Sequence, residues 1–236
     1  KGSLLNIINE DAGLPTNIVY DVYSDMQGGL WLATNNGIVH CEYPSPFSLI
    51  PDQGLIKDQI SDMLRFKNIF YAANSLGILY QEKGTDDFKL INGSNKPGMY
   101  LLNVDGELLA ATNWGVGIVD NYHLKEMLTN NSSNILLHSE YYPDRVYVGH
   151  RTGLQILQQQ KNKIKFNVYQ TAIDEQEINS IVEETNNSLW LLSDFGSLIH
   201  ITDDLKNLSS EQILKINFDR FTKENGLPGN DWDIYN

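Results

Sequence analysis

Residues 28–38, with the sequence GGLWLATNNGI, contain a complete short strand with a tight turn on each side. The two leading glycines suit a hairpin turn, because glycine adopts positive φ angles without steric cost. Residues 30–34 are apolar and β-prone, and residues 35–37 turn the chain again before another β-prone run at 38–43. This strand–turn–strand unit decides the fold because it recurs.

The unit returns along the whole chain at a nearly constant spacing. Its closing glycine recurs at steps of 40, 38, 38 and 43 residues, at Gly37, Gly77, Gly115, Gly153 and Gly196. A period near 40 is the signature of a repeat architecture, and four short strands per repeat are typical of a propeller blade. We therefore predict an all-β chain, a β-propeller of four-stranded antiparallel blades.

The repeat also sets the expected domain organisation, a single β-propeller fragment over residues 1–236. About five blades plus partial blades at both ends are predicted. The repeats cover residues 13–50, 53–92, 93–130, 132–170 and 174–222, and a further blade starts at 226–236. The fourth strand of the first repeat is expected at 47–50. In the third repeat its counterpart near Leu124 to Leu128 is either a strand or a short helical turn.

Neighbouring blades that pack face to face explain why the second strand of each repeat is apolar. The large aromatic residues of these strands are expected to be core wedges between blades. They are Trp31, Tyr71, Tyr147 and Trp190. Removing such a wedge leaves a large cavity, which costs about 3–5 kcal/mol.

Composition and charge narrow the classes of function. The 236 residues carry a net charge of −13 with a pI near 4.7, and the only loose group of lysines is Lys161, Lys163 and Lys165. Direct contact with nucleic acid is therefore not expected. The sequence has no run of about 18 apolar residues. Its single cysteine, Cys41, excludes an intrachain disulfide and is expected to be a buried structural thiol.

No residue pattern points to catalysis or to metal binding. The chain has no Gly-x-Ser-x-Gly sequence, and its five histidines lack the spacing of metal ligands. Paired acids such as Asp86 and Asp87 fall in turns or at strand ends and are interpreted as solvated. We predict no catalytic residue, no metal site and no cofactor, and structural roles for His40 and His200.

The string at residues 13–38, GLPTNIVYDVYSDMQGGLWLATNNGI, resembles the two-component regulator propeller repeat. That repeat reads, loosely, Gly-Leu-Pro-Ser-Asn, a strand, Asp-x-x-Gly-x-Leu-Trp and Gly-Thr-x-x-Gly-Leu. The resemblance is recognisable again at 188–196 and restarts at 226–228, whereas the second to fourth repeats lack the tryptophan.

The resemblance implies a sensor rather than an enzyme. In that family such repeats build the extracytoplasmic sensor of hybrid two-component histidine kinases, and many of these sensors respond to oligosaccharides. By resemblance, this chain is a periplasmic ligand-sensing part of an inner-membrane histidine kinase that controls transcription of glycan-use genes. The implied partners are an oligosaccharide, the remaining blades and signalling domains of the same chain, and a second copy in a homodimer.

Propeller topology suggests where a ligand binds. The blade-opening loops and the loops between second and third strands emerge on one face, and their amides, arginine and aromatics suit sugar hydroxyls and a sugar face. The candidate residues are Trp114, Arg151, His150, Asn113, Asn74, Asn35, Asn36, Asn17, Asp194, Phe195 and Asn179. Trp114 and Arg151 are the strongest candidates, because an asparagine in these loops is also explained by its tolerance of left-handed turn geometry.

Two other functions stay open on the sequence. The propeller face of a non-catalytic scaffold would bind another protein. A propeller-fold polysaccharide lyase or hydrolase would need clustered acidic, Tyr, His or Arg residues on one face, and only His150 and Arg151 hint at such a cluster.

Overall fold

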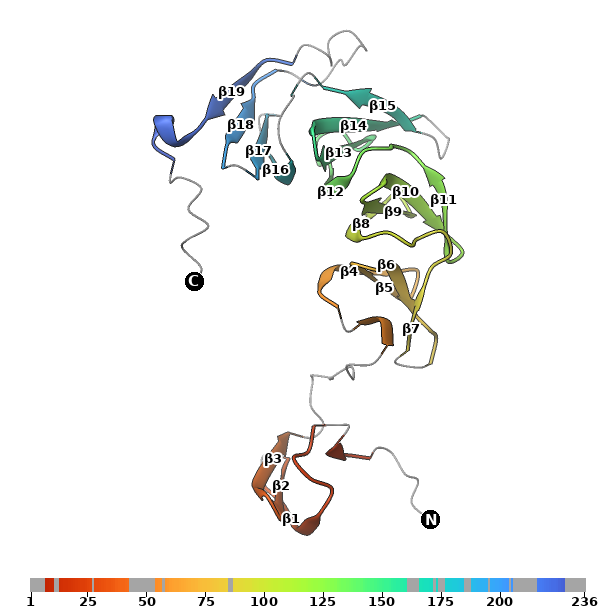
Figure 1. Ribbon diagram of the computed structural model, residues 1–236, viewed down its shortest axis with the longest axis vertical. Coiled ribbons are helices and arrows are strands. Elements are labelled where there is room, and N and C mark those ends of the chain that lie inside the picture. The colour runs from red at the N-terminus through yellow and green to blue at the C-terminus, as the bar shows by residue number, and fades with distance from the viewer. Residues whose placement is uncertain are drawn as a thin grey trace. The chain divides into compact units, whose positions relative to one another are not determined.

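The structure is a computed structural model in which the chain forms two compact units, residues 1–53 and residues 54–236 (Figure 1). The described residues are 7–10, 13–26, 28–42, 54–56, 58–84, 87–160, 166–171, 173, 177–184, 188–194, 196–203, 205 and 216–227. Within these ranges no helix is long and apolar enough to cross a membrane. The predicted partial blades at the two ends, and the predicted strand at 47–50, lie almost entirely outside the described residues.

The first unit contains blade 1, an antiparallel sheet of three described strands. These are β1 (Val19–Ser24), β2 (Gly29–Thr34) and β3 (Gly37–Glu42), in the order β1-β2-β3. Trp31 on β2 pairs with His40 on β3, and the turn between the two strands closes on Gly37. The strand–turn–strand reading of residues 28–38 is therefore confirmed.

The second unit contains four antiparallel sheets, each of four strands that follow one another in chain order. Blade 2 comprises β4 (Ile60–Phe66), β5 (Ile69–Asn74), β6 (Gly77–Gln81) and β7 (Phe88–Leu90). Blade 3 comprises β8 (Gly98–Val104), β9 (Glu107–Thr112), β10 (Gly115–Asp120) and β11 (His123–Met127). Blade 4 comprises β12 (Ser133–His138), β13 (Arg145–His150), β14 (Gly153–Gln159) and β15 (Phe166–Gln170). Blade 5 comprises β16 (Ile178–Glu183), β17 (Leu189–Ser193), β18 (Leu198–Ile201) and β19 (Phe218–Phe221). Short 3₁₀ turns lie at Gly54–Ile56 and Lys223–Asn225.

The core of the second unit lies between its blades rather than inside any one of them. One cluster joins blades 2 and 3, with Ile78 and Leu108 among its members. A second joins blades 3 and 4, and a third joins blades 4 and 5. A single sheet cannot bury both of its faces, so each apolar second strand is buried by a neighbouring sheet. The predicted all-β propeller fold class is confirmed by these sheets.

The question left open at Leu124 is settled, because this segment is the strand β11 and not a helical turn. The strand also ties blade 3 to blade 2 at its outer edge. The backbone amide of Leu124 donates to the carbonyl of Asn92 (2.8 Å), and the amide of Asn92 donates to the carbonyl of Tyr122 (2.8 Å).

The prediction that aromatic residues are wedges between blades is confirmed for two of the four residues. Tyr71 and Tyr147 are buried, with 4% and 0% of their surface exposed. Trp31 is 42% exposed within the first unit, and its role as a wedge toward another blade stays a prediction. Both tryptophans stack on a histidine of their own blade: the ring centroids of Trp31 and His40 are 4.3 Å apart, and those of Trp190 and His200 are 4.0 Å apart.

An acidic residue completes each of these tryptophan–histidine stacks. The indole nitrogen of Trp31 donates to Oδ2 of Asp25 (3.0 Å), which also lies 3.3 Å from Nε2 of His40. In blade 5, Glu184 lies 4.0 Å from His200. The structural roles expected of the two histidines agree with these contacts. Cys41 is half-buried rather than fully buried.

Candidate ligand-binding site

In each blade the turn between the second and third strands lies at the same end as the loop that opens the blade. The backbone amide of Asn113 donates to the carbonyl of Pro97 (3.0 Å), that of Arg151 to Ser132 (2.9 Å), and that of Asp194 to Glu177 (2.9 Å). We call this end of a blade its opening end. The topological argument for a common face is therefore correct within these blades.

The last residue of every second strand carries a buried side chain that accepts a hydrogen bond from the turn that follows. Oγ1 of Thr34 accepts the backbone amide two residues later in the chain, and Oγ1 of Thr112 does the same. Oδ1 of Asn74 accepts the amides of Leu76 and Gly77. The full set is Thr34, Asn74, Thr112, His150 and Ser193. Each of these residues stands three positions before the closing glycine of its repeat, which we call the marker glycine. The sequence pattern polar-x-x-Gly therefore signals this role.

Two of the predicted ligand contacts, Asn74 and His150, belong to this set and serve the fold. Both side chains are fully buried. Burial lowers the pKa of His150 to about 4, so its imidazole is neutral at pH 7. Nδ1 of His150 accepts the amide of Thr152 (3.2 Å), and Nε2 lies 3.3 Å from the side-chain amide of Gln170. Neither side chain reaches the surface at the opening end.

Trp114 and Arg151 are exposed at the opening ends of adjacent blades. Trp114 lies in the β9–β10 turn with 49% of its surface exposed, and Nζ of Lys96 lies 5.2 Å from its ring centroid. Arg151 lies in the β13–β14 turn. Ser132 connects the two turns, because its hydroxyl donates to Oδ1 of Asn113 (3.3 Å) and its carbonyl accepts the amide of Arg151.

A row of amides and carboxylates continues this surface from blade 4 to blade 5. The side-chain amide of Asn134 donates to Oε1 of Glu177 (2.6 Å) and to Oδ1 of Asn179 (2.9 Å). Asn179 in turn donates to Asp194. The structure therefore brings Asn113, Trp114 and Arg151 together, and separately Asn179 and Asp194.

The other candidate residues lie in the first unit or outside the described residues. Asn17 and Asn36 are held locally, since Oδ1 of Asn17 accepts the amide of Glu10 (2.8 Å) and the amide group of Asn36 donates to Pro15 (3.4 Å). Asn35 is exposed in the same unit, and Phe195 lies outside the described residues. A ligand-binding role for all of these residues stays a prediction.

Tolerance of left-handed turn geometry does not explain the asparagines of the predicted site. Among the described residues, the non-glycine positions with positive φ are Lys67, Asn68, Asp105, Asn121 and Tyr122. None of the predicted loop asparagines is in this set, because the marker glycines supply the left-handed positions of those turns: φ is +129° at Gly115 and at Gly153. These asparagines are therefore not required by left-handed geometry.

Comparison with known proteins agrees with this architecture of propeller blades. Residues 13–36 match the family model described as Two component regulator propeller, so the repeat recognised in the sequence is confirmed at these residues. No curated protein matches the chain.

Solved structures with TM-scores above 0.5 share the fold. One, the extracellular domain of a candidate one component system of B. thetaiotaomicron, is 15% identical with a TM-score of 0.52, over 83% of this chain and 31% of that one. A second structure, of a candidate hybrid two component system of the same organism, is 15% identical with a TM-score of 0.51, over 85% and 32%. Another such domain is 18% identical with a TM-score of 0.47, over 89% and 29%. The chain thus spans about a third of the length of these solved chains.

Proposed function

We propose that this chain is part of the extracellular, ligand-sensing region of a hybrid two-component sensor histidine kinase. Its ligand is an oligosaccharide, and its signal controls the transcription of glycan-use genes. The chain itself binds without turnover, and the compartment is the periplasm. The match of residues 13–36 to the two-component regulator repeat, and the fold shared with extracellular domains of such systems, support this proposal.

The observation that carries the ligand class is the Asn113–Trp114–Arg151 surface at the opening ends of blades 3 and 4. An exposed indole offers a face to the C–H groups of a sugar ring. The guanidinium and the amide offer donors, and the amide also accepts, which suits hydroxyl groups. The backbone and side-chain contacts through Ser132 hold the two turns in a fixed relation.

Binding at this surface would bias the relation between two sensor copies and pass the signal to the kinase. Blades that share their cores transmit a displacement as rigid bodies, because packed interiors are not continuously deformable. A ligand produces this effect only to the extent that it binds one arrangement more tightly than the other.

The test is a calorimetric titration of the full-length protein with plant and host oligosaccharides, repeated with Trp114→Ala and Arg151→Ala. Matched controls are Tyr141→Ala and Lys83→Ala, an exposed aromatic and an exposed cation in loops at the other end of their blades. We expect saturable binding that both site variants weaken at least tenfold and that neither control changes.

Two results would contradict the proposal. Silence across the whole panel would favour the protein-binding scaffold, and consumption of the oligosaccharide would favour the lyase or hydrolase. Oligosaccharide binding that is unchanged in both site variants would show that the ligand does not bind at the opening-end surface.

A further inference from the structure

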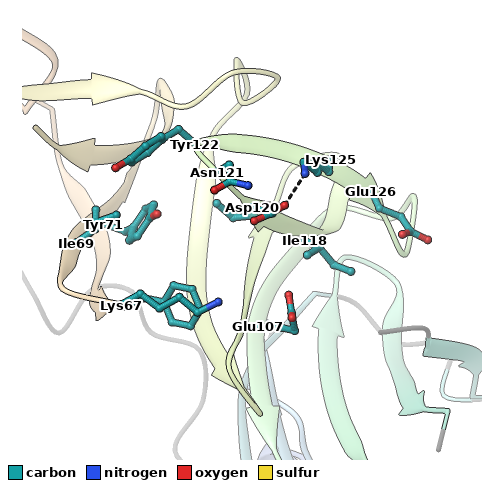
Figure 2. Close-up of a pocket in the computed structure, with 12 residues that line it drawn as sticks. Lys67, Ile69, Tyr71, Glu107, Ile118, Asp120, Asn121, Tyr122, Lys125 and Glu126 are labelled. Carbon is teal, nitrogen blue, oxygen red and sulfur yellow. Dashed lines mark hydrogen bonds and ion pairs between the residues drawn. The ribbon is translucent and has the colours of Figure 1, made fainter. Parts of the chain in front are cut away.

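A groove of about 520 Å³ lies between blades 2 and 3, at the end of the blades opposite the opening end. Its walls come from the β4–β5 turn of blade 2 and the β10–β11 turn of blade 3, as Figure 2 shows. The polar and aromatic lining includes Lys67, Tyr71, Glu107, Asp120, Asn121 and Tyr122. The volume falls within the range of about 300–1,000 Å³ that is usual for small-molecule sites.

The two turns that form the walls carry unusual residues for their geometry. Both are two-residue turns in which each central residue has positive φ: 46° and 68° at Lys67 and Asn68, and 47° and 61° at Asn121 and Tyr122. Such turns favour Asn-Gly or Asp-Gly. The β8–β9 turn follows that preference with Asp105 and Gly106 and does not line the groove. Lysine and tyrosine in a left-handed conformation are strained, and strain of this kind clusters at functional sites.

Tyr71 contributes a hydroxyl group to the groove. Its side chain rises from β5, is only 4% exposed and lines the groove. Figure 2 shows the ring reaching from blade 2 toward the Asp120–Asn121 side of the groove. Burial raises the pKa of Tyr71, and the nearby Tyr122 and Asp120 add to the effect, so the hydroxyl stays protonated and able to donate.

The rest of the lining offers mixed donors and acceptors on a rigid support. Lys125 is ion-paired with Asp120 and holds the pKa of that carboxyl below its usual value. The side chain of Asn121 adds an amide group to the lining. The ring of Tyr122 is fixed against Tyr80, with the ring centroids 4.2 Å apart, and remains 38% exposed.

The net charge of the lining limits the class of ligand. Lys67 and Lys125 oppose Asp120, Glu107 and Glu126, which leaves a formal charge of −1 (2 − 3). This negative charge disfavours a sulfated or uronate-rich ligand, because the lining has no surplus of cations to neutralise the negative groups of the ligand.

We propose that this groove is a second ligand site, and that it takes a neutral polyhydroxylated ligand of one or two sugar rings. Tyr71, Asn121 and the Asp120–Lys125 pair both donate to and accept from its hydroxyls, and the exposed face of Tyr122 covers its C–H groups. The inference rests on the proposed function only for the broad class of ligand, a saccharide. The groove lies at the other end of the blades, and binding there needs no signalling role.

The experiment isolates the groove from the opening-end surface. The full-length protein with Trp114→Ala and Arg151→Ala is titrated with maltose, cellobiose, lactose and mannobiose, and with a sulfated chondroitin disaccharide as the charged comparison. Tyr71→Phe, Asn121→Ala and Tyr122→Gly are then added one at a time. Tyr100→Phe is the matched control, a half-buried tyrosine of blade 3 outside the groove.

We expect saturable binding of at least one neutral disaccharide in that background and none of the sulfated one. Tyr71→Phe and Tyr122→Gly should weaken it at least tenfold, and Tyr100→Phe by less than twofold. Tyr122→Gly creates an Asn-Gly turn, so a loss of binding with an unchanged melting temperature would not reflect misfolding.

The failures of the two proposals are distinguishable. If the neutral disaccharides do not bind in the double-variant background, or bind unaffected by Tyr71→Phe and Tyr122→Gly, the groove is not a sugar site, whatever the opening end does. If groove binding is intact but Trp114→Ala and Arg151→Ala leave wild-type binding unchanged, the proposed opening-end site alone fails.

Discussion

At the scale of single residues, the most consistent feature is the buried acceptor three residues before each marker glycine. Threonine, asparagine, histidine and serine all fill this position, because each offers an atom that can accept a turn amide. A buried amide without such a partner would be costly, typically by about 1–3 kcal/mol. The side-chain type therefore varies while the hydrogen bond is kept.

His150 makes this position sensitive to pH in blade 4. Its pKa is lowered to about 4 in the folded chain by burial, against about 6.5 when unfolded, so between these values only the unfolded chain binds the proton. We predict that its contribution to stability is complete above about pH 6.5 and is lost as the pH falls toward 4. The upper limit of this loss is about 3 kcal/mol.

Urea denaturation of the chain at pH 7.5 and pH 4.5 measures this effect, with His150→Asn as the reference. Asparagine already serves at the equivalent position of blade 2, where Asn74 accepts two turn amides. The variant should lose less stability between the two pH values than the wild type. Equal losses would show that His150 does not titrate as described.

Gly115 is required both by its backbone angle and by lack of space. Its φ is +129°, and an added Cβ would overlap the carbonyl of Thr129. We predict that Gly115→Ala lowers the free energy of unfolding by about 3 kcal/mol or more. Gly106→Ala, at φ +83° with no heavy atom within 4 Å of the added Cβ, should lower it by only about 1 kcal/mol. Denaturation midpoints that rank the two variants in the opposite order would contradict this explanation.

At the scale of strands and blades, Glu183 is the main polar link between blades 4 and 5. Oε1 accepts the hydroxyls of Ser139 (2.6 Å) and Tyr147 (3.3 Å), and Oε2 accepts the amide of Glu140 (2.8 Å). All three donors belong to blade 4, and the ring of Tyr147 is fully buried. The carboxylate therefore satisfies groups that no water replaces easily.

We predict that Glu183→Ala destabilises the chain by about 2 kcal/mol, because the hydroxyls of Ser139 and Tyr147 and the amide of Glu140 lose this acceptor. The urea midpoint measures the change. Adding Tyr147→Phe should recover part of the loss, since one of the buried groups that has lost its acceptor is then gone. Glu126→Ala, an exposed carboxylate on β11, is the control and should change stability by less than about 0.5 kcal/mol. A wild-type midpoint in Glu183→Ala would show that the blades are joined by their apolar cores alone.

The strands were predictable from the sequence where the repeat is well preserved, and less so elsewhere. Residues 28–38 define two strands and a turn, and the structure agrees. The weak segment at Leu124 was ambiguous, because its strand character depends on pairing with β10 and on contact with Asn92 of another blade.

At the scale of the whole molecule, a repeat period near 40 was enough to predict a propeller fold. The candidate site followed only in part, since topology placed the turns of Trp114 and Arg151 at one end but could not show their link through Ser132. The groove between blades 2 and 3 could not be predicted, because its walls combine residues 66–71 with residues 118–126. No sequence pattern relates these two segments before the blades are packed.

The central claim is that these blades bind a saccharide without changing it. Equilibrium dialysis of the full-length protein against the oligosaccharide panel, with mass spectrometry of both compartments, tests binding and turnover in one measurement. We predict that at least one oligosaccharide is enriched on the protein side with its mass unchanged. New masses from hydrolysis or elimination, or an equal distribution of every sugar, would contradict the claim.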